Sequence, residues 1–231
     1  MIEPPPARLA AQLPEGAEET LTRLVELVAA DPAAPISDRD RPRVWKAHVG
    51  DSLAGAELPE LAGARRIADL GSGAGFPGLV LAIALPRAEI DLIESIAHKC
   101  AFLSRAIART GIANARAVKA RSEEWAAGEG LEAYDAVTAR AVGSLATVVE
   151  LATPLLRDGG HLVAWEGKRN PEREAAAERA CPRLALAPAG VRPAGPLAGG
   201  AHRHFHLFRK TGPTPTGIPR RPGMAAKKPL A

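Results

Sequence analysis

Apolar residues along the chain follow two spacings in turn, and the alternation predicts strands separated by helices. Short apolar runs that favour strands lie at 65–70, 89–94, 115–120, 134–141, 161–166, 184–187 and 204–208. Helical spacing lies at 17–29, 43–53, 78–85, 97–110, 144–156 and 171–180. Residues 188–201 are rich in Gly, Pro and Ala, so we expect a loop there. The alternation predicts an α/β fold with a mostly parallel sheet and helices on both faces.

The most informative stretch begins at the end of the first expected strand. Asp69 closes the apolar run, Gly71, Gly73 and Gly75 follow at alternate positions, and Phe76-Pro77-Gly78 leads into a helix. Glycine permits positive φ and a close approach of the backbone to a ligand. We therefore expect a ligand above the carboxyl end of this strand.

Two cofactors compete for this loop, and a glycine-rich turn without a ligand is the third possibility. Gly73-x-Gly75-x-x-Gly78 fits the dinucleotide pattern, and Glu94 follows at the spacing of a ribose-binding acid. Asp69 favours S-adenosylmethionine over a nicotinamide dinucleotide, because a carboxylate repels a pyrophosphate and attracts sulfonium and ammonium groups. Either cofactor would use Glu94 as an acceptor for the ribose hydroxyls.

Polar residues from three other places can reach the same edge of the sheet. His48 and Asp51 lie three residues apart on the short helix expected ahead of the first strand, although a lone histidine is more often structural. Ser122 and Glu123 follow the third strand, where Ser122 suits a helix N-cap and the turn would lie beside an adenine. Arg140 ends the fourth strand, and its buried guanidinium needs either a salt bridge or a ligand.

Composition narrows the class of protein. At 231 residues the chain suits one α/β domain with short additions. The net charge is +4, and residues 209–231 hold six cations and no acid, which favours a phosphate-bearing partner or a solvated basic tail. Cys100 and Cys181 suggest neither a disulfide framework nor a metal site. No signal-peptide pattern or long apolar run occurs, so we expect a cytoplasmic protein that does not enter a membrane.

A set of motifs resembles the bacterial small-subunit (16S) ribosomal RNA guanine-N7 methyltransferases, also called glucose-inhibited division protein B. The resemblance runs from about residue 43 to the end. Its motifs are Arg43-x-Trp-x-x-His48-x-x-Asp51-Ser52, Asp69-x-Gly-Ser-Gly-x-Gly-Phe-Pro-Gly78, Glu94-Ser95, Arg121-x-Glu123-Glu124, Thr138-Ala-Arg140-Ala141, Arg203-His204, and a tail with Thr214-Pro215, Pro222-Gly223 and Lys227-Lys228-Pro229-Leu230.

The resemblance implies a class I S-adenosylmethionine-dependent methyltransferase, with a Rossmann-like seven-stranded sheet whose last strand is antiparallel. It implies methyl transfer to N7 of a guanine in 16S ribosomal RNA, with naked RNA or the small ribosomal subunit as partner, and we expect a monomer. The residues that it implies for the cofactor are Gly71, Phe76, Ser122, Glu123 and Arg140, with Glu94 as the ribose acid. Arg121, His48 and Asp51 match further site positions.

Guanine N7 has a lone pair and no proton to lose, so its methylation needs alignment rather than a general base. Arg140, Arg121, His48 and Asp51 are therefore expected to position the reactants. The alternatives are a methyltransferase that acts on a small molecule or a protein, and an RNA-binding module without turnover.

The expected organisation is a helical extension at 1–64, a methyltransferase domain at 65–210 and a basic tail at 211–231. Two features depart from the family pattern, and the first is that the family's Trp-Asn … Asn-Leu-Thr segment ahead of His48 is not recognisable here. In the second, the family's Lys-Gly after the fifth strand reads Glu166-Gly167 here, so Lys168 or Arg169 would have to replace that lysine.

Overall fold

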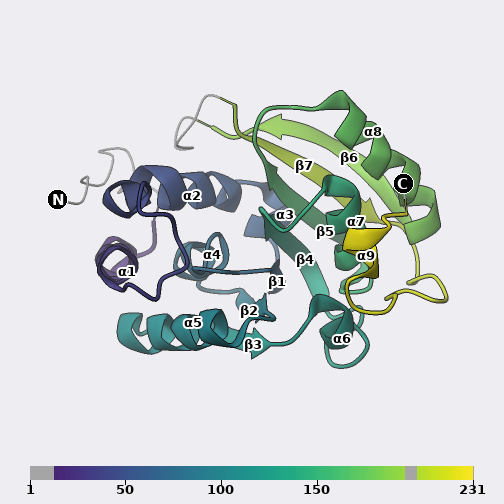
Figure 1. Cartoon of the computed structure of the whole chain (residues 1–231). Coiled ribbons are helices and arrows are strands. Elements are labelled where there is room, and N and C mark those ends of the chain that lie inside the picture. Colours follow the sequence, from purple (N-terminus) through teal and green to yellow (C-terminus); the bar gives the residue numbers. More distant parts are fainter. Residues whose placement is uncertain (1–12, 196–201, 231) are drawn as a thin grey trace.

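The computed structural model of the chain describes residues 13–195 and 202–230, and its centre is one seven-stranded sheet (Figure 1). The strand order is β3-β2-β1-β4-β5-β7-β6. All neighbours from β3 to β5 pair in parallel, whereas β7 is antiparallel to both β5 and β6. The bounds are β1 Arg66–Leu70, β2 Glu89–Glu94, β3 Ala115–Lys119, β4 Tyr134–Arg140, β5 Leu156–Glu166, β6 Leu186–Pro193 and β7 His204–Lys210. This order and the antiparallel last strand confirm the predicted fold class.

Helices cover both faces of the sheet, and each face has its own apolar core. One core joins the sheet to α1 (Ala17–Ala30), α2 (Gly50–Ala56), α4 (Gly78–Ala84) and α5 (Ala97–Thr110). The other joins it to α6 (Ser122–Ala126), α7 (Leu145–Ala152) and α8 (Pro171–Ala180). The short elements are η2 (Arg41–Arg43), η3 (Trp45–Val49), α3 (Pro59–Ala62), η4 (Cys181–Leu184) and α9 (Met224–Lys227). Two buried faces explain why the parallel strands read as nearly continuous apolar runs.

Four expected elements differ from the structure. The single helix expected at 43–53 is divided into η2, a π-helical turn η3 and α2. The N-cap of α6 is Arg121 and not Ser122, because Ser122 already lies in the first helical turn. Strand β5 starts at Leu156, so Gly159-Gly160 lies within it rather than ahead of it.

The fourth difference concerns the last hairpin. The expected strand at 184–187 and loop at 188–201 are replaced by β6, which extends to Pro193 with a register shift between Pro188 and Gly190. Proline and glycine are tolerated there because β6 is an edge strand. The remainder of that expected loop, 196–201, lies outside the described residues.

The predicted division at residues 64 and 210 stays a prediction. Helix α1 shares a core with α4 and α5, since its buried Leu21, Leu24, Val25 and Val28 belong to that apolar cluster. At the other end, α9 lies against α7 (Figure 1). None of the helices in the described part of the chain is long and apolar enough to cross a membrane.

Candidate functional site

The glycine-rich loop connects β1 to α4 and takes the backbone conformation that its sequence predicts. Gly71, Gly73 and Gly75 have φ values of 62°, 55° and 90°, in the left-handed region that favours glycine. Gly78 starts α4 and allows a close approach, because a Cβ there would lie 2.2 Å from Leu92 Cδ2 and 2.7 Å from Asp69 Oδ2. The loop therefore stays close to the carboxyl ends of β1 and β2.

Asp69 lies beneath this loop and is 1% exposed. Its Oδ1 accepts a hydrogen bond from Thr138 Oγ1 at 2.8 Å, and its Oδ2 accepts one from the amide of Gly78 at 3.3 Å. Burial raises the pKa of the Asp69 carboxyl to about 6, although both hydrogen bonds and the charge of Arg140 act in the opposite direction. The side chain thus connects β1, β4 and α4 and is largely ionised at neutral pH.

Glu94 ends β2 and is buried beside the same loop. Its Oε2 accepts a hydrogen bond from the amide of Gly73 at 3.1 Å, and its Oε1 accepts one from the amide of Ile96 at 2.8 Å. A carboxylate has about four lone-pair positions, so two remain for further donors. These bonds fix the carboxylate while leaving it able to accept from a ligand.

A cavity of about 280 Å³ opens at the carboxyl ends of β1, β2 and β4. Its wall contains five of the predicted site residues: Gly71, Glu94, Arg121, Ser122 and Glu123. The remainder of the wall includes Lys99, Val142, Thr147 and Leu151, together with Gly223 and Ala226 from the end of the chain. The cavity therefore lies at the end of the sheet where open α/β folds bind their ligands.

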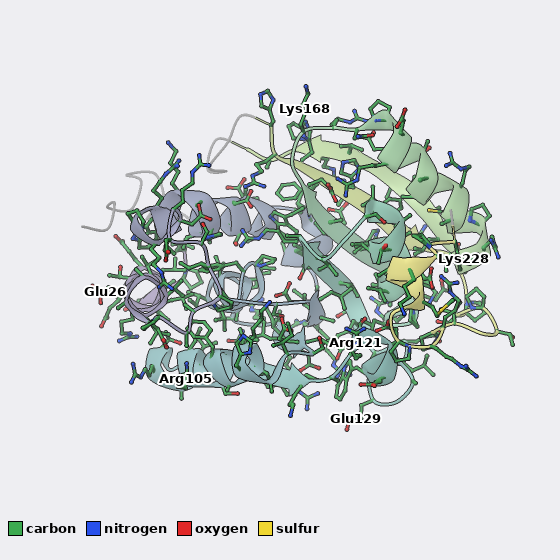
Figure 2. The ribbon with its side chains drawn as sticks, viewed as in Figure 1. Glu26, Arg105, Arg121, Glu129, Lys168 and Lys228 are labelled. Atoms are coloured by element: carbon green, nitrogen blue, oxygen red, sulfur yellow. The ribbon has the colours of Figure 1, made fainter. Side chains whose placement is uncertain are left out.

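The α6 turn supplies one side of this cavity. The Glu123 carboxylate is nearly buried and accepts hydrogen bonds from Ser122 Oγ at 3.2 Å and from the amide of Gly223 at 2.7 Å. Glu124 accepts a hydrogen bond from the amide of Arg121 at 3.3 Å and so completes the start of the helix. Figure 2 shows the exposed Arg121 side chain beside α6 and the C-terminal segment.

Arg140, at the end of β4, organises a second polar cluster around the glycine loop. Its Nη1 donates to Asp51 Oδ2 at 3.2 Å, and its Nη2 donates to His48 Nδ1 at 3.0 Å. The Phe76 ring lies 5.6 Å from the Arg140 guanidinium carbon and stacks on His48, with ring centroids 4.9 Å apart. Trp165 Nε1 donates to the Asp51 carbonyl at 2.9 Å and so anchors α2 to β5. Arg140 is thus joined to two other predicted site residues, His48 and Asp51, of which His48 lies 92 residues away in the sequence.

The hydrogen bond from Arg140 determines the state of His48. Because a guanidinium can only donate, His48 Nδ1 must accept, and the proton of the neutral ring lies on Nε2. Burial and the charge of Arg140 lower the pKa of His48 to about 4, so the ring is neutral at pH 7. Within the described residues, His48 Nε2 and Asp51 Oδ1 are buried without a hydrogen-bond partner. Each of these two atoms faces a charged neighbour beyond hydrogen-bond distance, since Asp40 Oδ2 lies 3.9 Å from His48 Nε2 and Arg203 Nε lies 3.8 Å from Asp51 Oδ1.

The predicted residues thus form two groups rather than one. Glu94, Arg121, Ser122 and Glu123 surround the cavity, whereas His48, Asp51, Phe76 and Arg140 form the cluster on the other side of the loop. Three residues were not predicted: Thr138, which is the partner of Asp69, and Thr147 and Leu151 in the cavity wall. Thr138 belongs to the Thr-Ala-Arg-Ala motif and could have been found there, whereas nothing in the sequence of α7 distinguishes Thr147.

The position that departs from the family pattern can also be located. Glu166 ends β5 half-buried, and burial raises the pKa of its carboxyl. Arg169 forms an ion pair with Glu174, whereas Lys168 is exposed at the upper edge of the molecule in Figure 2. Lys168 is therefore the more available of the two predicted replacements. Within the described residues no group of three or more His, Cys, Asp or Glu side chains could hold a metal ion.

Solved structures share the fold of this chain. A SAM dependent methyltransferase from Aquifex aeolicus superposes with a TM-score of 0.55 over 82% of this chain and 98% of that one, at 13% identity. Fibrillarin from Aeropyrum pernix, solved with natively bound S-adenosyl-L-methionine, gives a TM-score of 0.52 over 69% of this chain and 72% of that one, at 19% identity. At these identities the comparison shows the fold alone.

Curated relatives are closer in sequence. Ribosomal RNA small subunit methyltransferase G of Desulfitobacterium hafniense is 37% identical over 79% of this chain and 76% of its own length. The protein of the same name from Syntrophomonas wolfei is 37% identical over 84% of this chain and 90% of its own length. The GidB family, described as rRNA small subunit methyltransferase G, matches residues 19–192. As its motifs predicted, the chain belongs to the GidB family of small-subunit rRNA methyltransferases.

Proposed function

We propose that this chain transfers a methyl group from S-adenosylmethionine to N7 of a guanine in 16S ribosomal RNA. The observation that carries the proposal is the cavity at the carboxyl ends of β1, β2 and β4, in a chain of the GidB family. Substrates and cofactors of open α/β sheets bind at this edge. Beyond family membership, we propose which atom accepts the methyl group and which residues position it.

The residues around the cavity fit S-adenosylmethionine. Glu94 retains lone pairs for two ribose hydroxyls, and the Ser122–Glu123 turn supplies polar groups for an adenine. The glycines of the loop leave its backbone open to a close ligand. When bound, this cofactor supplies an electrophilic methyl group on a positively charged sulfur. Asp69 lies beneath the loop and is not part of the cavity wall. Its ionised carboxylate therefore favours a cation in the cavity through its charge and not through direct contact.

The Arg140 cluster is the proposed acceptor site. Guanine presents N7 and O6 as acceptors along one edge, and arginine is the side chain that most often reads this edge. Phe76 is buried between the guanidinium of Arg140 and the ring of His48, and it therefore helps to hold both side chains in place. Asp51 and His48 keep Arg140 in place through their hydrogen bonds to its guanidinium.

Proton transfer has no role in this proposal. Attack by the lone pair of guanine N7 releases no proton in the transfer step, so alignment alone is required. His48 suits this chemistry, because its Nδ1 lone pair is occupied by Arg140 and its pKa of about 4 keeps it neutral. We therefore assign Arg140, His48 and Asp51 to positioning, and we assign Arg121 to the entrance of the cofactor cavity.

RNA binding would use cations around this edge, among them Lys168 and the exposed Arg221, Lys227 and Lys228. We propose that the chain acts as a monomer on RNA or on the small ribosomal subunit. Light scattering of the purified protein, alone and with RNA, tests the oligomeric state, and a stable dimer at micromolar concentration would contradict the monomer.

The direct test is transfer of a tritiated methyl group from S-adenosylmethionine to purified small ribosomal subunits that lack the modification. We expect label in 16S RNA, loss of labelling in Arg140→Ala, and no loss in Arg109→Ala, a matched control on an exposed position of α5. Cofactor binding without incorporation would favour an RNA-binding module. Label in a protein or small molecule instead would favour another acceptor, and tight NAD binding without S-adenosylmethionine binding would overturn the proposal.

A further inference from the structure

The C-terminal segment 220–228 does not extend away from the domain but packs against α7 and the cofactor cavity. Its helix α9 contacts α7, and the yellow segment lies beside α7 in Figure 1. Ala225 is 2% exposed, and Ile218 and Leu230 on either side pack against the apolar core of that face. The basic tail that the sequence suggested as an RNA-binding arm is therefore partly a structural element.

An ion pair between the partly buried Arg220 and the buried Glu150 holds this segment. Arg220 Nε donates to Glu150 Oε1 at 2.6 Å, and Arg220 Nη2 donates to Glu150 Oε2 at 2.7 Å. Glu150 lies on α7 with its side chain 3% exposed. Arg220 Nη2 also donates to the carbonyl of Lys228 at 2.7 Å, so one guanidinium closes the segment on itself and fixes it to α7. Two-bond pairing of this kind is geometrically specific.

Two further hydrogen bonds join the segment to the cavity wall. Thr147 Oγ1, from α7, donates to the carbonyl of Ala225 at 3.2 Å. The amide of Gly223 donates to Glu123 Oε1 at 2.7 Å. Gly223 and Ala226 line the cavity together with Glu94 and Ser122, so the segment faces β2 and α6 across the same space.

We propose that segment 220–228 is the outer wall of the cofactor cavity and that Arg220 is a positioning residue for the cofactor. This inference rests on the proposed function, because it assigns the cavity to S-adenosylmethionine. Arg220 acts through Glu150 and the Lys228 carbonyl, which together place Gly223 against Glu123. The Gly223 amide in turn fixes the carboxylate beside the expected adenine.

The same segment has a second face. Arg221, Lys227 and Lys228 are exposed, and no ion pair to them occurs within the described residues. RNA phosphates bound there would stabilise the segment in its docked position, and binding reciprocity then requires RNA and cofactor to strengthen each other. The inner face thus serves the cofactor and the outer face serves RNA.

Arg220→Ala and Arg221→Ala separate the two faces. Arg220→Ala is expected to weaken S-adenosylmethionine about tenfold in calorimetry and to raise KM for the cofactor more than it lowers kcat. Arg221→Ala is expected to leave cofactor affinity unchanged in the absence of RNA and to weaken RNA binding with a smaller salt slope. If Arg220→Ala binds the cofactor as tightly as wild type, the assignment of the wall is wrong.

Loss of Arg220 leaves a buried carboxylate without its partner, which could disturb α7 itself. The variant Glu150→Gln/Arg220→Gln removes both charges together, and it is expected to keep its near-UV circular dichroism while still binding the cofactor more weakly. A double variant with wild-type cofactor affinity would overturn the inference. The proposed function fails separately: it fails if the wild-type chain does not bind S-adenosylmethionine, whatever the variants do.

Discussion

Asp69 gives the sharpest quantitative test of the site, through the variant Asp69→Asn. The side chain is 1% exposed, and burial raises its folded-state pKa to about 6, from the ordinary value of 3.8. Because the folded pKa is raised, the unfolded chain releases this proton first. The stabilising contribution of Asp69 is complete below pH 3.8 and is lost as the pH rises through 6.

The size of the effect follows from the two pKa values. A difference of about two units corresponds to about 3 kcal/mol of unfolding free energy, and roughly 2 kcal/mol of it falls between pH 4 and pH 7. Asparagine does not titrate. The unfolding free energy of Asp69→Asn minus that of wild type should therefore rise by about 2 kcal/mol from pH 4 to pH 7.

Chemical denaturation at half-unit pH steps measures this difference. Most other titrating groups are common to both proteins and cancel in the subtraction. Asparagine can accept from Thr138 but its amide nitrogen cannot accept from Gly78, so the variant starts with a constant loss and only the change with pH is diagnostic. If the difference in unfolding free energy between the two proteins stays constant from pH 4 to pH 7, the pKa of Asp69 is not raised by burial.

Calorimetry with S-adenosylmethionine extends the same test to function. A cation in the cavity favours the ionised carboxylate, so wild-type affinity should fall as the pH drops through 6. Asp69→Asn should bind more weakly at pH 7.5 and show less pH dependence. Equal affinity of the two proteins at pH 7.5 would show that Asp69 supports only the loop.

Three further predictions concern other parts of the site. Gly78→Ala places a Cβ 2.2 Å from Leu92 Cδ2 and should lower the unfolding free energy by about 1–3 kcal/mol in urea denaturation. The control Gly63→Ala, whose Cβ has its nearest atom at 3.4 Å, should change the unfolding free energy little. Equal stabilities of the two variants would contradict the close packing at Gly78. Lys168→Ala should lower RNA affinity in filter binding and reduce the slope of log affinity against log salt concentration by about 1. Arg169 is paired with Glu174, so Arg169→Ala should lower RNA affinity less. A larger loss in Arg169→Ala would assign the RNA contact to Arg169. The pKa of His48 is lowered, so the contribution of the neutral ring to the unfolding free energy is complete above pH 6.5 and is lost as the pH falls through 4. His48→Gln should therefore avoid up to about 3 kcal/mol of the acid destabilisation that wild type shows. Parallel plots of unfolding free energy against pH for the two proteins would refute the neutral buried ring.

Local patterns predicted most of the fold because each central element carries its own signal. The strand Glu89–Glu94, the helix Ala97–Thr110 and the helix Pro171–Ala180 have the predicted bounds. Apolar spacing determines the first two locally, with Gly111 as a stop signal for the helix, whereas Pro171 is the start signal of the charged third element. The extension of β6 was missed because its residues are mostly exposed and include Pro and Gly, so only its pairing with β7 makes it a strand.

The site was predictable where a motif lies within one loop. Gly71, Gly73 and Gly75 have positive φ, as the glycine spacing indicated, and Glu94 lies next to them. The pairing of Arg140 with Asp51 and His48 depends on α2 packing across the sheet edge, which no local pattern specifies. The docking of the tail is a similar case, because a basic Pro/Gly-rich segment usually indicates a solvated chain end.

The identity of the methylated atom tests whether the methyl group reaches N7 of a guanine without a protein base. After reaction with small ribosomal subunits, 16S RNA should be digested to nucleosides and examined by mass spectrometry, with chemical cleavage at 7-methylguanosine to map the position. We expect one modified guanine, found as 7-methylguanosine, and a rate that shows no titration of a protein base between pH 6.5 and pH 8.5. A methyl group on a base other than guanine, or on an exocyclic amine or a ribose oxygen, would contradict this expectation.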